Sequence, residues 1–287
     1  MVIILSDQPI TAGLNPSRIA FTLSYNGHAY HGWQAQNSGV PTVQKYLEMA
    51  VSKVANEPVS VVCAGRTDRA VHASHQVVHF DTQAVRSERS WVLGCNSALP
   101  RDISVSWASK VDPAFHARYG ATSRRYHYCI YNFPTRPANF ANEMTWCHHS
   151  LNEKQMHIAA QCLVGTHDFS SFRATGCQAK SPVRSIEHVE VFRVGPMVII
   201  DIKGNAFLHH MVRNIAGVLM EIGAGQAAPG WCQEVLNAKD RTQGGVTALP
   251  NGLFLTQVKY ATEFGIPYQN LGSGWLQALL CASGRTE

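Results

Sequence analysis

The stretch Gly65-Arg66-Thr67-Asp68 places a carboxylate two positions after a guanidinium, directly behind a short apolar run. That run, Val62 to Ala64, carries no charge and predicts a buried strand, so the polar residues begin where the strand ends. Loops positioned by a rigid strand often carry functional side chains. An Asp in a polar turn is more often a turn former or a helix cap. The position is therefore compatible with a surface turn or with a catalytic loop.

Two local features favour the catalytic loop. Arg66 is close enough in sequence to hold the Asp68 carboxylate in its ionised form, against the protonation that burial would favour. An ionised, partly dehydrated Asp can act as a nucleophile or as a general base. His72 and His75 follow closely, so the segment is dense in groups that titrate or donate hydrogen bonds.

The fourteen histidines raise the alternative of a metal site. His72, His75 and His79 have a spacing that would align them on a helix, but residues 76–82 alternate like a strand, so His79 is expected not to share a face with the other two. No Glu lies between His72 and His75 as it does in a zinc-protease helix. We therefore expect no metal site. The adjacent histidine pairs are also expected to point to different faces: His148-His149 and His209-His210.

Periodicity predicts the elements that position this loop. The first half reads as strand, helix, strand, strand, helix, strand, over residues 18–27, 42–56, 59–64, 76–82, 87–99 and 102–111. Thr42 and Ser87 are suitable N-caps for the two helices. The second half repeats this order over residues 123–133, 152–165, 182–195, 196–205, 205–225 and 252–260.

This order of elements predicts an α+β fold made of two tandem ferredoxin-like (βαββαβ) halves with mainly antiparallel sheets. We expect a lead over residues 1–17, an N-terminal half with the Asp loop over 18–115, a C-terminal half over 116–260 and a tail over 261–287. The halves share their element order and no sequence repeat.

Composition limits the class of protein. The 24 basic and 19 acidic residues give a net charge of +5, a mild preference for a polyanionic partner. Eight scattered cysteines without a Cys-x-x-Cys pair argue against a zinc ribbon and against a disulfide scaffold. No apolar run approaches the ~20 residues of a membrane helix, and the N-terminus has no basic leader. We expect a soluble, cytoplasmic protein that does not interact with membranes.

Five separated motifs occur in a characteristic order: GRTD followed by VHA, SRRYHYCIYN, FSSFRA, HHMVRN and GLFL. In wording and order, the chain from about Arg18 to Tyr260 resembles the tRNA pseudouridine synthase A family. The resemblance implies an isomerase that converts uridines at positions 38 to 40 of the tRNA anticodon arm to pseudouridine by base flipping. It also implies a homodimer without cofactor or metal, whose two halves flank a central basic active-site cleft.

The resemblance also implies roles for individual residues. Asp68 is the catalytic aspartate, and Arg66 evicts the target base and takes its place in the stack. Tyr126 stacks on the uracil and serves in proton transfer, Arg213 pairs with Asp68, and Leu253 supports the base. Without the resemblance, Tyr126 and Leu253 would be expected in the core, and Arg213 would be expected to extend to solvent.

Further arginines are candidates for phosphate contacts, which weaken as salt rises. They are Arg69, Arg124, Arg125, Arg173 and Arg184.

The chain departs from the family pattern directly after GRTD, where Arg69-Ala70 replaces the usual Ala-Gly. If that glycine adopts a positive φ, Ala70 strains the loop by about 1 kcal/mol. The charge of Arg69 would lie beside the carboxylate, where it could contact phosphate.

The reaction leaves three routes open for Asp68: attack on ribose C1′, attack on base C6, or action as a base on the ribose. Two other classes of protein compete with the isomerase. A non-catalytic RNA-binding protein would not depend on Asp68, and a metal-dependent hydrolase using the histidines would be inactivated by a chelator.

Overall fold

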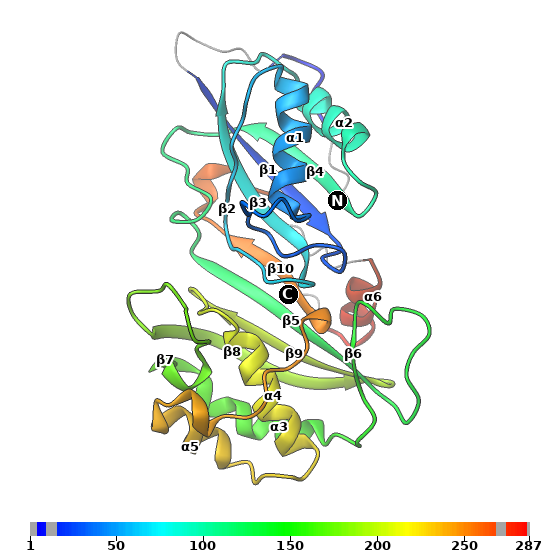
Figure 1. The fold of residues 1–287 in the computed structure, drawn as a ribbon, viewed down its shortest axis with the longest axis vertical. Coiled ribbons are helices and arrows are strands. Elements are labelled where there is room, and N and C mark those ends of the chain that lie inside the picture. The colour runs from blue at the N-terminus through cyan, green and yellow to red at the C-terminus, as the bar shows by residue number, and fades with distance from the viewer. Residues whose placement is uncertain (1–4, 10–15, 268–273, 286–287) are drawn as a thin grey trace. The chain divides into compact units, whose positions relative to one another are not determined.

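The computed structural model describes residues 5–9, 16–267 and 274–285 and divides into two compact units (Figure 1). The first unit takes residues 1–122 and 255–278, and the second takes residues 123–254 and 279–285. Parts of the predicted lead and tail, residues 1–4, 10–15, 268–273 and 286–287, lie outside the described residues. No described helix is long and apolar enough to cross a membrane.

The first unit is built on an antiparallel sheet. Strand β1 (Ser17–Tyr25) lies between β3 (His72–Thr82) and β4 (Ile103–Lys110). The two-residue strand β2 (Val62–Cys63) pairs with β3, so these four strands are ordered β4-β1-β3-β2. Strand β10 (Leu253–Lys259) also adjoins β3. With one helix after β1 and another after β3, this is the βαββαβ arrangement of a ferredoxin-like domain.

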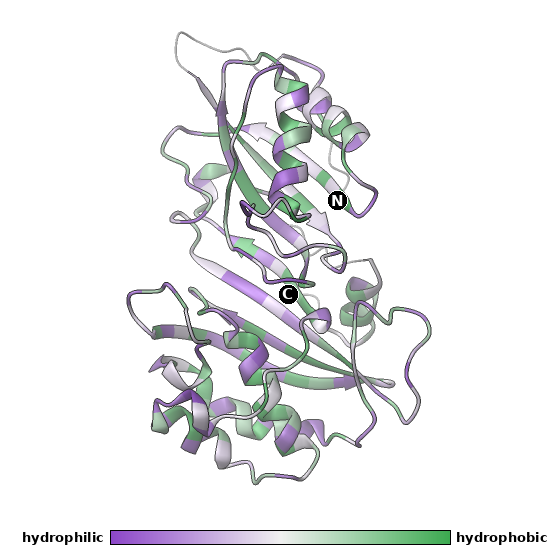
Figure 2. Ribbon diagram, viewed as in Figure 1, coloured by the Kyte–Doolittle hydropathy of each residue, from purple (hydrophilic) through white to green (hydrophobic). Residues whose placement is uncertain are grey.

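Two amphipathic helices cover one face of this sheet, and hydrophobic and hydrophilic residues alternate along them (Figures 1 and 2). Helix α1 (Val43–Ala55) begins after Thr42, whose hydroxyl accepts a hydrogen bond from the Lys45 amide at 3.4 Å. Helix α2 (Glu88–Ala98) begins after Ser87, which caps it in the same way. Both predicted caps are confirmed. The core beneath α2 is aromatic, with the Phe21, Phe80 and Trp91 rings in edge-on contact.

In the second unit, four strands of the sheet follow the order β5-β9-β8-β7. The neighbouring pairs are antiparallel, and β6 runs parallel to β5. Helices α3 and α4 pack together, and α3 lies against β8 (Figure 1). The strands are β5 (Ser123–Asn132), β6 (Thr145–Cys147), β7 (Gly165–Asp168), β8 (Val183–Val194) and β9 (Met197–Gly204). The helices are α3 (Glu153–Ala160), α4 (Met211–Gly223) and α5 (Trp231–Ala238).

The remaining helices are short. Single 3-10 turns are found at η1 (Gln161–Leu163), η2 (Ser170–Phe172), η3 (Arg241–Gln243), η4 (Pro250–Gly252) and η5 (Thr262–Phe264). The tail carries α6 (Gly274–Ala282).

The predicted α+β class with mainly antiparallel strands is confirmed. Some predicted boundaries are wrong. Helix α4 begins at Met211 and not at residue 205, because His210 adopts a left-handed conformation with φ of 60° directly before it. Strand β3 begins at His72, four residues before the predicted start. The sequence did not predict β6, β7 or α5.

Candidate active site

The Asp68 loop connects the end of β2 to the start of β3 in the first unit. Along it the side chains alternate in exposure: Arg66 is exposed, Thr67 is buried, Asp68 is partly exposed and Arg69 is exposed. The Asp68 carboxylate is therefore accessible to a substrate, and exposed guanidinium groups flank it in the sequence. The structure therefore brings the predicted residues Arg66, Asp68 and Arg69 together on one loop.

Main-chain hydrogen bonds hold this loop to the segment that follows β1. The Trp33 amide donates to the Thr67 carbonyl at 3.0 Å, and the Ala70 amide donates to the Tyr30 carbonyl at 3.2 Å. Within the loop, the Val71 amide donates to the Asp68 carbonyl at 3.2 Å and closes a turn. Asp68 is thus bracketed on both sides by backbone contacts, as a preorganised site requires.

Gly32 lies directly against the backbone of the loop at Thr67 and Asp68. A Cβ at this position would lie 2.8 Å from the Thr67 carbonyl oxygen and 3.1 Å from the Asp68 carbonyl carbon. Its φ of +91° also favours glycine. The sequence did not indicate this role, because Gly32 precedes Asp68 by 36 residues and belongs to no periodic element.

Ala70 adopts a φ of 60° in the turn directly after Asp68. This is the left-handed region, in which the Cβ of an L-residue crowds the backbone. The prediction that the loop needs a positive φ at this position is confirmed. The chain therefore holds an alanine in a conformation that costs less for glycine.

The histidines of β3 are core residues. Each accepts a hydrogen bond at Nδ1 from a backbone amide. The Gly27 amide donates to His72 at 3.0 Å, the Val258 amide donates to His75 at 3.2 Å, and the Ala117 amide donates to His79 at 3.1 Å. Burial lowers the pKa of His75 and of His79 to about 4, so both are neutral near pH 7.

One expectation about histidine orientation is wrong. The adjacent histidines lie together and do not diverge, with ring centroids 3.9 Å apart for His148-His149 and 4.0 Å apart for His209-His210. Neither pair belongs entirely to one helix or strand, so the side-chain alternation of a regular element does not apply.

The second unit carries the other predicted site residues on three elements. Tyr126 is a buried residue of β5, and its ring packs edge-on against Phe207 with the centroids 5.0 Å apart. Arg213 lies in the first turn of α4, and its Nε donates to the Ala248 carbonyl at 2.9 Å. Leu253 is the buried first residue of β10.

The predicted phosphate-binding arginines differ in their surroundings. Arg124 and Arg173 are part-buried, and their guanidinium groups donate to backbone carbonyls, those of Asn205 for Arg124 and of Cys177 and Ala179 for Arg173. Such bonds orient a cation without cancelling its charge. Arg184 likewise donates to the Ser181 and Val183 carbonyls.

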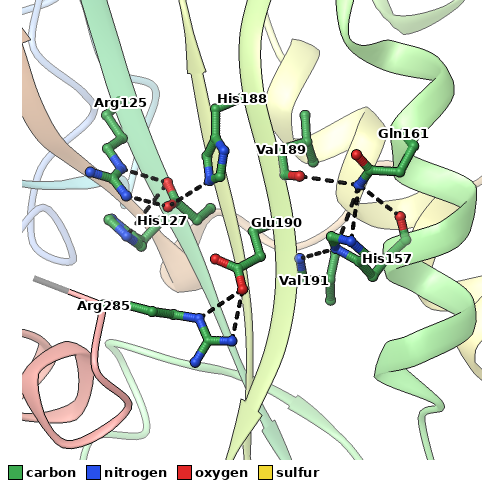
Figure 3. Close-up of polar contacts among 10 residues, drawn as sticks. Arg125, His127, His157, Gln161, His188, Val189, Glu190, Val191 and Arg285 are labelled. Carbon is green, nitrogen blue, oxygen red and sulfur yellow. Dashed lines mark hydrogen bonds and ion pairs between the residues drawn. The ribbon is translucent and has the colours of Figure 1, made fainter. Parts of the chain in front are cut away.

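Arg125 instead faces a carboxylate. Its Nε and Nη2 atoms meet the two Asp201 oxygens at 2.8 and 2.6 Å, in the bidentate geometry of a strong ion pair (Figure 3). Asp201 is buried on β9, where burial alone would raise its pKa. Burial is the largest single influence, but the hydrogen bonds from Arg125 together with the neighbouring His127 and His188 outweigh it and hold the pKa of the carboxyl well below its usual range.

Two histidines complete the Asp201 cluster. His127 Nε2 lies 3.6 Å and His188 Nε2 lies 3.4 Å from the carboxylate (Figure 3). Burial lowers the pKa of His127 to about 4, so it is neutral near pH 7 and Arg125 balances the Asp201 charge. Within the described second unit, this arrangement is best explained as a support for the sheet.

Comparisons with known proteins match most of the chain. A family model described as tRNA pseudouridine synthase matches residues 22–120 and 159–261, which include Asp68, Arg213 and Leu253 but not Tyr126. A Pseudomonas aeruginosa protein named tRNA pseudouridine synthase A is 57% identical over 269 residues, 94% of either chain. Proteins of the same name from Coxiella burnetii and Aeromonas salmonicida are 54% and 52% identical, over 91% and 90% of this chain and 99% and 96% of their own.

Proposed function

The chain belongs to the tRNA pseudouridine synthase family, and we propose that Asp68 is the residue on which its reaction depends. The protein is an isomerase that converts uridine to pseudouridine in the anticodon arm of tRNA. Within the anticodon arm, its target uridines are those at positions 38 to 40.

The observation that supports Asp68 is its place on a braced loop. The carboxylate is partly exposed, lies between Arg66 and Arg69 in sequence, and belongs to a turn held by backbone bonds and by the close approach of Gly32. A group that must meet one atom of a flipped nucleotide needs this degree of positioning.

The chemistry requires a carboxylate of this kind. Pseudouridine formation breaks the bond between ribose C1′ and base N1, turns the base, and joins C1′ to C5. C5 loses its proton to solvent and N1 takes up a proton, so the product is an isomer of the substrate. The isomerisation has no net oxidation or reduction. An ionised Asp68 can attack C1′, attack C6 of the base, or remove a proton from the ribose. The reaction needs neither a metal nor a cofactor on any of these routes.

The target uridine must leave the helical stack before any of these steps. Flipping costs a few kcal/mol, and the exposed Arg66 is placed to fill the vacated space. Stacking on an aromatic ring returns about 1–3 kcal/mol per base, which is the role of Tyr126. Arg213 is the additional catalytic cation, and Leu253 is the apolar support of the base.

Binding of the tRNA rests on cations that contact phosphates. Arg69, Arg124, Arg125 and Arg173 are the proposed contacts, and Arg125 is the weakest of them because Asp201 already balances its charge. Phosphate contacts release counterions, so affinity falls as salt rises. The protein acts in the cytoplasm as a homodimer.

The experiment uses tRNA transcripts with a single anticodon-arm uridine at position 38, 39 or 40, incubated with the protein in parallel with and without EDTA. Pseudouridine is mapped by carbodiimide modification and primer extension. We expect a stop at each of the three positions, and none when cytidine replaces the uridine. Tight binding without any stop would favour a non-catalytic RNA-binding protein, and loss of the stops with EDTA alone would favour a metal-dependent enzyme.

A further inference from the structure

We propose that Gln76 is a positioning residue for the Asp68 loop, acting through a buried hydrogen-bond network that includes Tyr25 and Thr67. This inference rests on the proposed role of Asp68. Gln76 is fully buried near the middle of β3, where half of the other buried positions of the strand are apolar. Burying a primary amide is costly unless its hydrogen bonds are satisfied, so its partners indicate why it is there.

The side-chain amide of Gln76 clamps the first residue of the GRTD stretch at two points. Its Nε2 donates to the Gly65 carbonyl at 2.6 Å, and its Oε1 accepts from the Gly65 amide at 3.3 Å. Gly65 thus fixes which end of the amide is oxygen and which is nitrogen. Neither methionine nor leucine could provide this pair of bonds.

The clamp lies where the backbone ladder ends. The last main-chain bond from this segment to β3 runs from the Ala64 amide to the Val77 carbonyl at 2.8 Å. At the next residue, Gly65, the Gln76 side chain takes the place of a backbone partner. The sheet therefore fixes one further residue of the loop, Gly65, through a side chain and not through a longer strand.

Tyr25 extends the same hydrogen-bond network toward Asp68. Its hydroxyl lies 2.8 Å from Thr67 Oγ1 and accepts from Gln76 Nε2 at 3.4 Å. Tyr25 and Thr67 are both buried, and Thr67 is the residue directly before Asp68. The network thus secures the loop at Gly65 and at Thr67, on either side of Arg66.

A loop held at these points keeps the carboxylate in a fixed place. A misplacement of about 1 Å can reduce a rate roughly 100-fold without removing any group that takes part in the chemistry. The network touches no exposed surface that a tRNA could contact. It should therefore affect the chemical step and leave tRNA binding nearly unchanged.

The test compares Gln76→Met and Tyr25→Phe with the native protein in single-turnover pseudouridine formation, with tRNA affinity measured in parallel. We expect a rate roughly 10- to 100-fold lower for Gln76→Met, a smaller loss for Tyr25→Phe, and tRNA affinity within about twofold of native. The combined variant should lose less than the product of the single losses, because both changes release the same loop.

The matched control is Thr22→Val, which removes a part-buried hydrogen bond between the buried Thr22 and Ser106, 2.8 Å long, from the same sheet but not from the loop. It should keep the native rate. An equal rate loss in Thr22→Val, or a Gln76→Met variant that loses affinity and keeps its rate, would overturn the positioning role.

Two further measurements separate this proposal from the proposed function. Asp68→Asn with the native rate would refute the role of Asp68 itself. Amide hydrogen exchange tests the clamp without reference to activity: Gln76→Met should accelerate exchange at Gly65 and Val71 and leave the β1 amides unchanged. Unchanged exchange at both residues would refute the clamp even if Asp68 proves catalytic.

Discussion

Replacing Ala70 by glycine should stabilise the protein, although the substitution removes a side-chain carbon. Ala70 has a φ of 60°, a conformation that costs an L-residue about 1–2 kcal/mol. Glycine avoids this strain but loses about 0.4–1 kcal/mol to the greater freedom of its unfolded chain. The net gain is on the order of 0.5–1 kcal/mol, which corresponds to a rise in Tm of roughly 1–4 °C for a unit of this size.

The assay is differential scanning calorimetry of Ala70→Gly beside Ala114→Gly. Ala114 is an exposed residue of the same unit and is not among the residues with positive φ. Its change to glycine should therefore lower Tm by an amount set by chain entropy alone. A Tm for Ala70→Gly that falls in parallel with that of Ala114→Gly would refute the strain in the loop.

Three other perturbations have defined outcomes. Gly32→Ala should displace the Asp68 loop, because its Cβ would meet the Thr67 carbonyl oxygen at 2.8 Å. We expect the free energy of unfolding to fall by more than about 1 kcal/mol and turnover to slow. Native turnover would contradict the support of the loop by Gly32. Asp201→Asn should lower the free energy of unfolding measured in urea, by less than the about 3–5 kcal/mol of a fully buried pair, because it leaves the part-buried Arg125 charge unbalanced; an unchanged midpoint would contradict the pairing. Stability should fall as pH drops from about 6.5 toward 4, because unfolded His75 binds a proton that the folded residue, with a pKa of about 4, does not; a His75→Gln variant with the native pH slope would contradict this.

Local chemistry was readable from the sequence. The Thr42 and Ser87 caps and the helices they begin depend on neighbouring residues, and the structure has them as predicted. The strands beside the Asp68 loop differ from the prediction: β2 covers only Val62–Cys63 of the predicted 59–64, and β3 begins at His72. Helix α5 lacked such a signal: it follows Gly230, which offers no side-chain cap. The predicted start of α4 failed because His210, expected inside the helix, adopts a left-handed conformation directly before Met211.

For the candidate site, as for the fold, the sequence predicted only the features that neighbouring residues determine. The motif identified the loop residues, and the usual Gly at the position of Ala70 indicated the positive φ. The supports of the loop were not predictable, because they act across the fold. Gly32 and Tyr25 precede Asp68 by 36 and 43 residues, and Gln76 resembles any polar residue of an alternating strand. Only the pairing of β1 with β3 and the loop after β1 brings these residues to Gly65 and Thr67.

The most direct test of the central claim is tritium release from tRNA that carries 5-tritiated uridine, with native protein and Asp68→Asn compared in the presence of EDTA. Each isomerisation exchanges the C5 hydrogen, so release counts turnovers. The account predicts release by the native protein and none above background by Asp68→Asn, with tRNA binding retained by both. Equal release by the two proteins would contradict the role of Asp68.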